Sequence, residues 1–299
     1  MKVDMKKANK IKAPVSERFL YAANILLLIV ISFTMLYPFW DILVKSFMTD
    51  LEINRHRFSF WPTQFHFEAY EIIFTDVSYR FGRAFFNSVI ITVLTTVYQL
   101  AITAMTAYAL TRKTLPGKNF FFVFFIITMY FGGGMVPYYT VVKFLGLSDT
   151  LSVMIIPSFL SVFNMLVVRA FFQGLPAELE EAAKIDGASD FKVFFSIVLP
   201  LSGAVLATIA LFIAVGKWND WYTALLFIQV ADKRPLAYAL QNIIERSSGK
   251  SIGNGQTTQI IGKSVQNAAI VVAVFPIMMI YPFFQKHFVK GVLVGAVKG

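Results

Sequence analysis

Cysteine is absent from the 299 residues of this chain, and charged residues make up only 15% of it. The absence of cysteine excludes disulfide bonds, thiolate metal ligands and cysteine nucleophiles. The charged fraction is well below the roughly one quarter that is typical of a soluble domain. Hydrophobic residues make up 57% and lie in long blocks, which indicates a protein with several membrane spans.

A phosphate-binding loop of the form G-x-x-x-x-G-K-[ST] is also absent from the sequence. One Gly-Lys-Ser tripeptide begins at Gly249, but the first glycine of the motif would fall at Ile244. A second begins at Gly262, and there the first glycine would fall at Thr257. We therefore expect that this chain does not hydrolyse ATP.

Ionisable side chains are rare inside the apolar blocks. Asp41 and Asp220 are the only carboxylates there, both toward the outer ends. His56, His66 and His287 lie outside the blocks, and a metal site at the first two is a weak alternative. An ion-driven carrier would need carboxylates in mid-span, and a membrane-embedded enzyme would need clustered His, Asp or Glu. Both classes are therefore disfavoured.

The net charge of +10 leaves two alternatives. It would suit nucleic-acid binding, or it would result from a lysine-rich cytoplasmic side of a membrane protein. The second fits the apolar blocks, so we expect membrane lipid as a partner and no nucleic acid.

The fold class that we expect is an all-α polytopic membrane protein with six transmembrane helices. A spanning helix needs about 20 mainly apolar residues, and six runs have a suitable length. They cover residues 19–44, 84–110, 120–139, 151–172, 201–228 and 265–284.

The distribution of Lys and Arg predicts the orientation. Placing the amino terminus in the cytoplasm puts its basic tail, the loop 111–118 and the basic carboxyl end on the inside, as the positive-inside rule requires. The expected parts are a cytoplasmic tail (1–18), a transmembrane domain (19–290) with external loops (45–83 and 229–264) and a cytoplasmic loop (173–200), and a second cytoplasmic tail (291–299).

The cytoplasmic loop is charged and helix-forming, and it contains the stretch EEAAKIDGASDFKVFFSIVLP. Pro176 favours a helix start, and acidic residues near that start favour a helix over 176–185. Gly187 would end this helix in the left-handed conformation, and Ser189 would cap a second one. Pro200 would mark the bend back into the bilayer. The second helix would carry an apolar stripe of Phe191, Phe194, Phe195 and Val198. The alternative is an amphipathic loop on the membrane surface.

The same loop resembles the EAA motif of membrane subunits of binding-protein-dependent ABC importers. That motif reads Glu-Ala-Ala, three residues, Gly, nine residues, Ile, one residue, Leu-Pro, and every spacing is kept here. The fuller form EEAAKIDGAS, with MVPYYTVVKFLGLSDT, AVGKWNDW and FVKGVLVGAVKG, looks like the carbohydrate branch, the MalG/LplC-like permeases. The resemblance extends over essentially the whole chain from the first span onward.

The resemblance implies a type I importer fold with a coupling helix that docks into a cleft of an ATPase subunit. Glu181 would be the polar contact to that ATPase, and Gly187 the turn. ATP and magnesium would be bound by the ATPase, with no metal or cofactor on this chain. The residues expected to couple the subunits are Glu181, Ala182, Ala183, Asp186, Gly187, Ala188, Ile197, Leu199 and Pro200.

The resemblance also implies partners and a location. The partners would be a homologous permease in a heterodimer, two ATPase subunits, an extracytoplasmic binding protein and a carbohydrate. The complex would lie in the bacterial cell membrane, with both termini of this chain in the cytoplasm. A permease for another solute, such as a peptide or polyamine, is the alternative, and an ion-coupled carrier is less favoured.

Polar and aromatic residues interrupt the fifth apolar run at GKWNDWYTALLF. A charge near the bilayer centre costs at least about 2.5 kcal/mol, so these residues should face protein or a water-filled cavity. Lys143 and Lys217 would suit the carboxylates of acidic sugars. The alternative is an interfacial belt of Trp and Tyr with a Lys–Asp pair. The substrate-path candidates are Lys217, Trp218, Asn219, Asp220, Trp221, Tyr138 and Lys143.

Two glycine-rich stretches have expected roles. FGGGMVPYY at residues 131–139 would be an anion-binding nest or, as we favour, the unwound outer end of the third span, with a bend at Pro137. The resemblance implies that the external loop 229–264 reaches into the sugar cleft of the binding protein. It also implies that a flexible tail, 286–299, reaches the ATPase interface. The candidate contact residues of the external loop are Ser248, Gly249, Gly253, Asn254 and Gly255.

Overall fold

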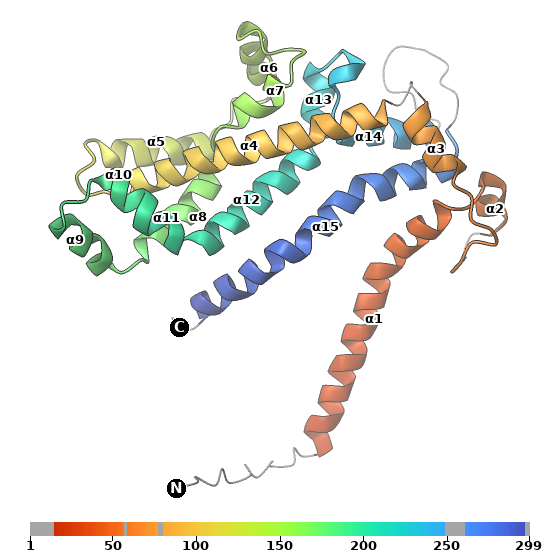
Figure 1. Ribbon diagram of the computed structural model, residues 1–299, viewed down its shortest axis with the longest axis horizontal. Helices are drawn as coiled ribbons and strands as arrows, with labels where there is room; N and C mark the ends of the chain where they lie inside the picture. The colour runs from red at the N-terminus through yellow and green to blue at the C-terminus, as the bar shows by residue number, and fades with distance from the viewer. Residues whose placement is uncertain (1–14, 57–58, 77–79, 249–260, 297–299) are drawn as a thin grey trace.

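The computed structural model describes residues 15–56, 59–76, 80–248 and 261–296 (Figure 1). In these ranges the regular structure is helical, without strands. The helices are α1 (Val15–Lys45), α2 (Asp50–Arg55), α3 (Glu68–Thr75), α4 (Phe81–Ala109), α5 (Lys118–Tyr130), α6 (Met135–Phe144), α7 (Ser152–Ile155), η1 (Ile156–Ser158), α8 (Val162–Gln173), α9 (Ala177–Ile185), α10 (Asp190–Val193), η2 (Phe194–Val198), α11 (Leu199–Leu201), α12 (Gly203–Trp218), α13 (Trp221–Phe227), η3 (Ala231–Lys233), α14 (Leu236–Ser247) and α15 (Lys263–Ala296).

Three helices of the described residues are long and apolar enough to cross a membrane. They are Phe19–Lys45 of α1, the whole of α4, and Lys263–Ile280 of α15. Three bent pairs of helices also qualify: α5 with α6, the α7–η1 segment with α8, and the α10–α11 segment with α12. Their bends are 115°, 46° and 80°, respectively. If each bent pair is one span, the chain has six spans by length and composition, as expected.

The break in the third span lies at its three consecutive glycines. Helix α5 ends at Tyr130 and α6 begins at Met135, with Gly134 at a φ of +83°. Glycine adopts this left-handed conformation without steric cost. The unwound end that we expected at this position is therefore present. The expectation that Pro137 sets the bend in this span is wrong. Pro137 lies in the first turn of α6, where proline is tolerated.

The fifth expected span is divided into two helices. Helix α12 ends at Trp218, and α13 begins at Trp221. The Asp220 carboxylate accepts a hydrogen bond from the Thr223 amide at 3.1 Å and so caps α13. The expectation of one helix over 201–228 is wrong, because this cap starts a new helix at a point where α12 has already ended.

Helix α4 is the central helix of the molecule, and α12 and α8 pack along it. Ala107 of α4, Val168 of α8 and Ile209 of α12 belong to a buried apolar cluster toward one end of α4. Phe81 of α4 and Ala269 of α15 belong to a second cluster toward the other end. Small residues such as alanine allow membrane helices to approach closely. Two separate clusters therefore fix the two ends of α4.

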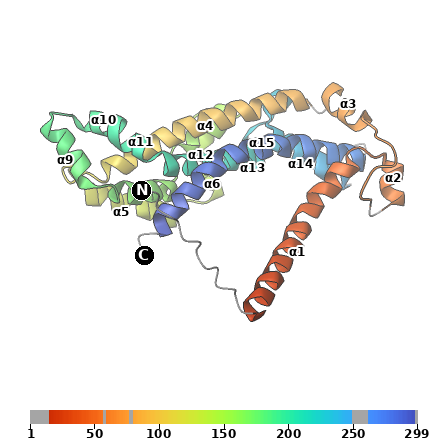
Figure 2. The same ribbon diagram turned by 60° about the horizontal axis from the view of Figure 1, so that its bottom comes forward.

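The cytoplasmic loop and the short outer helices lie at opposite ends of the molecule. Figures 1 and 2 show α9 and α10 at one extremity and α2 and α3 at the other. Helix α1 extends away from the bundle, and the side chains of its apolar stretch are exposed in this chain (Figure 1). This arrangement separates the loops 173–200 and 45–83 by the length of the spans.

Two segments expected to be loops are largely helical. Helix α14 occupies the middle of the loop 229–264 and buries Leu236 and Ile243, which lie on one helical face. Helix α15 continues to Ala296, so the tail that we expected to be flexible is helical as far as this residue. Gly291 and Gly295 lower helix propensity without removing a backbone hydrogen bond, so the helix can pass through them.

Candidate functional site

The cytoplasmic loop forms a small helix–turn–helix, which we call the knob (residues 176–201). Gly187 has a φ of +78° directly after α9. The Ala188 amide donates to the Ala183 carbonyl at 2.9 Å, and the Gly187 amide donates to the Lys184 carbonyl at 3.0 Å. These two bonds form the Schellman motif that ends many helices. The first helix and its glycine stop agree with the prediction.

The second helix of the knob begins with the expected cap. The Ser189 hydroxyl oxygen accepts a hydrogen bond from the Lys192 amide at 3.4 Å, and α10 starts at Asp190. The apolar stripe, however, is wrong in half of its members. Phe194 and Val198 are buried, whereas Phe191 and Phe195 are 75% and 58% exposed. The helix widens to a π-helix over η2, and this changes the direction of successive side chains.

Most of the EAA motif lies on the open side of the knob. Glu181, Ala182, Asp186, Gly187 and Pro200 are exposed. Their exposure leaves the first part of the motif accessible to another subunit. The remaining motif residues, Ala183, Ala188, Ile197 and Leu199, are half-buried. The 80° bend between α11 and α12 lies at Ser202, two residues after Pro200.

Arg112, in the loop after α4, binds the knob through the Glu180 carboxylate. Its Nη1 and Nη2 donate to Glu180 Oε2 and Oε1 at 2.5 and 2.8 Å. The two side chains are only 17% and 20% exposed. Donating these hydrogen bonds to Glu180 raises the pKa of Arg112, so the guanidinium remains charged. The sequence alone does not reveal this pair, because its members are 68 residues apart and no motif contains both.

Tyr108, in the last turn of α4, extends the same contact. The Arg112 Cζ lies 4.3 Å from the centroid of the Tyr108 ring, and the Tyr108 hydroxyl donates to the Asp190 carbonyl at 3.2 Å. Beside them, an apolar hollow of about 430 Å³ is lined by Met105 and Phe191, among others. The carboxyl end of α4 therefore contacts both helices of the knob.

The substrate-path candidates of the fifth span separate into two groups. Lys217 and Asp220 form an ion pair at 2.9 Å, with side chains 15% and 17% exposed. Asn219 is exposed, and its amide donates to the Val215 carbonyl at 2.9 Å. Trp218, in contrast, is a core residue. Its Nε1 donates to the Ala273 carbonyl at 3.0 Å. The structure therefore does not place Trp218 with the other candidates.

The candidates of the third span lie near α13. Tyr138 is 41% exposed, and its ring contacts Phe227 at 5.7 Å between centroids. Trp221 is half-buried and its ring lies 5.7 Å from that of Tyr222, whose hydroxyl is 2.9 Å from the Met135 sulfur. The exposed Lys143 lies 5.1 Å from the centroid of the Tyr139 ring. Helices α6 and α13 thus bring Tyr138, Trp221 and Tyr222 to one region.

Four of the expected binding-protein contacts, Gly249, Gly253, Asn254 and Gly255, lie outside the described residues. Ser248 is exposed at the end of α14, and its hydroxyl donates to the Ile244 carbonyl at 2.9 Å.

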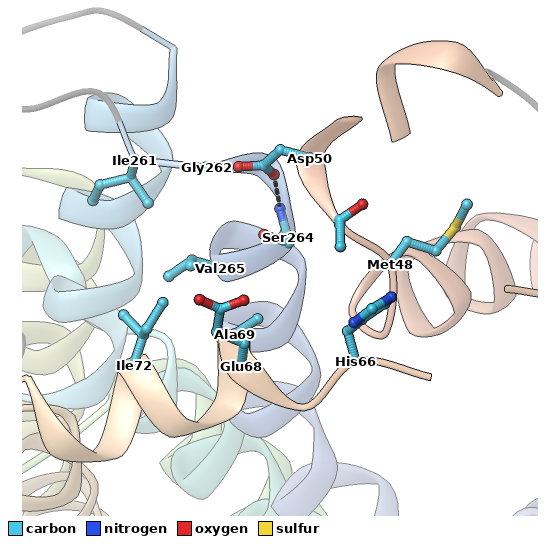
Figure 3. A pocket seen from close by; sticks show the side chains of 11 residues that line it. Met48, Asp50, His66, Glu68, Ala69, Ile72, Ile261, Gly262, Ser264 and Val265 are labelled. Carbon is cyan, nitrogen blue, oxygen red and sulfur yellow. Dashed lines mark hydrogen bonds between the residues drawn. The ribbon is translucent and has the colours of Figure 1, made fainter. Parts of the chain in front are cut away.

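A polar pocket of about 290 Å³ joins the outer helices to the start of α15. Figure 3 shows Asp50 of α2 directed at the Ser264 amide, which donates to Asp50 Oδ1 at 2.8 Å. His66 and Glu68 also line the pocket. Among the described residues there is no group of three His, Cys, Asp or Glu side chains that could hold a metal. The pocket is therefore interpreted as the capping site of α15.

The knob and the three broken spans lie in the part of the chain that matches a known family. Its model, described as "Binding-protein-dependent transport system inner membrane component", matches residues 117–294. This chain belongs to that family. It is accordingly a membrane-spanning transport component, and the resemblance based on the EAA motif is confirmed.

Curated relatives and a solved structure agree with this membership. Protein LplC of Bacillus subtilis (strain 168) is 43% identical over 92% of this chain and 94% of its own length. The polygalacturonan/rhamnogalacturonan transport system permease protein YtcP of the same organism is 40% identical over 88% and 92%, respectively. A chain in the crystal structure of a bacterial ABC transporter involved in the import of the acidic polysaccharide alginate has a TM-score of 0.83. It is 28% identical, with 92% of this chain and 99% of that chain covered, which confirms the expected fold.

Proposed function

We propose that this chain is the permease subunit of an ATP-driven ABC importer for oligosaccharides. The family description supports the transport role. Relatives support the substrate, because the names of YtcP and of the alginate transporter refer to polysaccharides. The polar and aromatic residues on α6, α12 and α13, among them Tyr138, Asn219 and Trp221, suit stacking on sugar rings and hydrogen bonding to hydroxyls. Lys143, Lys217 and Asp220 are the charged residues of the proposed path.

The proposed complex has five kinds of member: this permease, a homologous partner permease, two ATPase subunits, an extracytoplasmic binding protein and the sugar. ATP and magnesium are bound by the ATPases, since this sequence has no phosphate-binding loop. The loop 229–264, including Ser248 and the glycines after it, contacts the binding protein. Closure of the ATPases displaces the knobs and rotates the permeases between outward and inward states.

The complex lies in the bacterial cytoplasmic membrane in this proposal. The tails 1–18 and 291–299 are cytoplasmic, and the transmembrane domain covers 19–290. The positive-inside rule supports this orientation, because the basic amino-terminal tail and the basic loop after α4 then share one side with the knob.

The accessible EAA motif on a knob attached to α4 is the observation that carries the proposal. Glu181 is exposed and Glu180 is bound to Arg112, so adjacent glutamates have different surroundings. We assign Glu181 to the ATPase contact and Glu180 to the contact within this chain. A force on the knob then reaches α4 through the Arg112–Glu180 pair.

The test is sugar-stimulated ATP hydrolysis and uptake by the complex in proteoliposomes, with Glu181→Ala compared with Glu178→Ala. Both glutamates are exposed on α9, but only Glu181 belongs to the motif. We expect stimulation and uptake to fall about tenfold in Glu181→Ala, the loss of roughly 1.4 kcal/mol of coupling, and to remain in Glu178→Ala. Uptake that persists without any ATPase would contradict the proposal.

A further inference from the structure

A second pocket, of about 120 Å³, lies at the end of α4 that is opposite the knob. Three arginines line it from separate segments: Arg80 before α4, Arg234 before α14, and Arg246 in the last turn of α14. Tyr238 and Asn242 of α14 add polar groups, and small apolar side chains close the remainder. At about 30 Å³ per water molecule, a space of this size holds roughly four waters, or one carboxylate group with its immediate neighbours.

The pocket carries an excess of positive charge. No acidic side chain lines it in the part of the chain that the structure describes. The adjoining segments 80–88 and 229–248 contain five basic and two acidic residues. One of the two acidic residues, Asp232, forms an ion pair with Arg80, and its Oδ2 lies 3.6 Å from Arg83 Nη1. A single carboxylate therefore serves two guanidinium groups, and the lining remains cationic.

Arg234 has a side-chain hydrogen-bond donor that no described protein group satisfies. Its Nη2 donates to the Gln229 carbonyl at 3.0 Å, and its Cζ lies 4.6 Å from the centroid of the Tyr238 ring. Its Nε is buried and has no hydrogen-bond partner among the described residues. An unpaired buried donor destabilises a protein unless a ligand or water completes it. A guanidinium that stacks on an aromatic ring keeps its edge directed at such a ligand.

The backbone around the pocket is fixed in place. The buried Asn87 amide donates to the Asp232 and Arg234 carbonyls at 2.8 and 3.1 Å. The Leu236 amide donates to the buried Ser88 hydroxyl at 2.8 Å. The segment that carries Arg234 is thus held against α4 without any ligand. A site that is ordered before binding loses less entropy on binding.

We propose that this pocket binds a carboxylate of a uronic-acid oligosaccharide. The proposal rests on the function proposed above and adds the acidic class of the sugar. Guanidinium groups bind carboxylates through two parallel hydrogen bonds, and the Asn242 amide suits an adjacent hydroxyl. A uronate chain has a carboxylate on each sugar, and a pocket of this volume takes one of them. An acidic side chain of a docked protein would also bind the guanidinium groups, but it would bring no sugar hydroxyl to the Asn242 amide.

The test uses the full complex with its binding protein in proteoliposomes, and two probes: trigalacturonate and its neutral methyl ester. We expect Arg234→Gln and Arg246→Gln each to lower trigalacturonate uptake by about tenfold or more, with methyl ester uptake unchanged within about twofold. Arg83→Gln is the matched control. It removes one positive charge nearby, and its side chain is 66% exposed and outside the pocket lining, so both uptakes should remain.

Three results would overturn the assignment. Equal loss of both probes would mean that the arginines serve folding or docking. Weaker docking of the ligand-free binding protein to the Arg246→Gln complex would assign the carboxylate to that protein. An equal loss of trigalacturonate uptake in Arg83→Gln would mean that any positive charge in this region is sufficient, and that the pocket is not a specific site. The function proposal fails in a different way: a wild-type complex that transports neither probe nor any neutral oligosaccharide contradicts it, whatever the variants do.

Discussion

The Arg112 guanidinium makes two kinds of contact. Its nitrogens donate to the Glu180 carboxylate, and its Cζ lies over the Tyr108 ring. A bidentate pair of this kind fixes orientation as well as distance. Lysine has neither the fork nor the flat face, so it is a poor replacement at this position. The pair is therefore a rigid joint between α4 and α9.

Replacing Arg112 with Gln should weaken this joint. We expect a loss of about 1–3 kcal/mol in stability, because Glu180 then keeps its burial without its charged partner. Thermal unfolding of the purified chain in detergent measures this loss. Uptake should fall roughly tenfold while complex assembly persists. Lys113→Gln is the control, because Lys113 is exposed next to Arg112, and unchanged uptake in both variants would contradict the joint.

Trp218 should respond to substitution as a core residue. Trp218→Phe removes the hydrogen bond to the Ala273 carbonyl and the edge contact with Phe85, at 5.9 Å between centroids. We expect a stability loss of about 1–3 kcal/mol, measured by thermal unfolding, with an unchanged KM for sugar uptake. Trp221→Phe provides the comparison on the proposed path. A raised KM for Trp218→Phe at unchanged stability would return Trp218 to the substrate path.

At the scale of the element, the knob depends on a single left-handed residue. Gly187→Ala meets no atom within 4 Å, but its φ of +78° is strained for any side chain. We expect a cost of about 1–2 kcal/mol and a loss of sugar-stimulated ATP hydrolysis. Gly203→Ala, also with open space and without a positive φ, should leave hydrolysis unchanged. Equal hydrolysis in the two variants would show that the turn geometry is not needed.

The knob was also the part of the fold that the sequence predicted best. Its helix start, the Gly187 stop and the Ser189 cap are local signals, each resolved within a few residues. The break at Asn219 was missed although polar residues interrupt the run there, because the apolar residues on both sides made 201–228 long enough for one span. Arg112–Glu180 and Arg234–Tyr238 were missed for another reason. Arg112 and Glu180 are far apart in the chain, and Arg234 precedes the helix that carries Tyr238, so no motif or helical spacing joins either pair.

At the scale of the molecule, the Asp50 carboxylate connects the outer helices to the last span. It caps α15 through Ser264, and a side chain at Gly262 would overlap it. We expect Gly262→Ala to cost about 0.5–2 kcal/mol, the usual value of a helix cap, because Asp50 must then turn away. Adding Asp50→Ala to Gly262→Ala should cost little more.

Thermal unfolding of both single variants and the double variant measures this coupling. Gly82→Ala is the control, since no atom lies within 4 Å of its added carbon. Strictly additive losses would mean that Gly262 and Asp50 act independently, and the capping assignment would then fail.

Helix α1 has its main contact within the described residues with α15, which follows the other described helices in chain order. The 217 residues between Lys45 and Lys263 take roughly 10–45 s to translate at bacterial and eukaryotic rates. During that interval the first span has entered the bilayer, and its native neighbour does not yet exist. The apolar surface of α1 must therefore be covered by lipid or by an insertion factor until α15 has been made. Chains that stall before α15 should present an unpaired first helix to the quality-control proteases of the membrane.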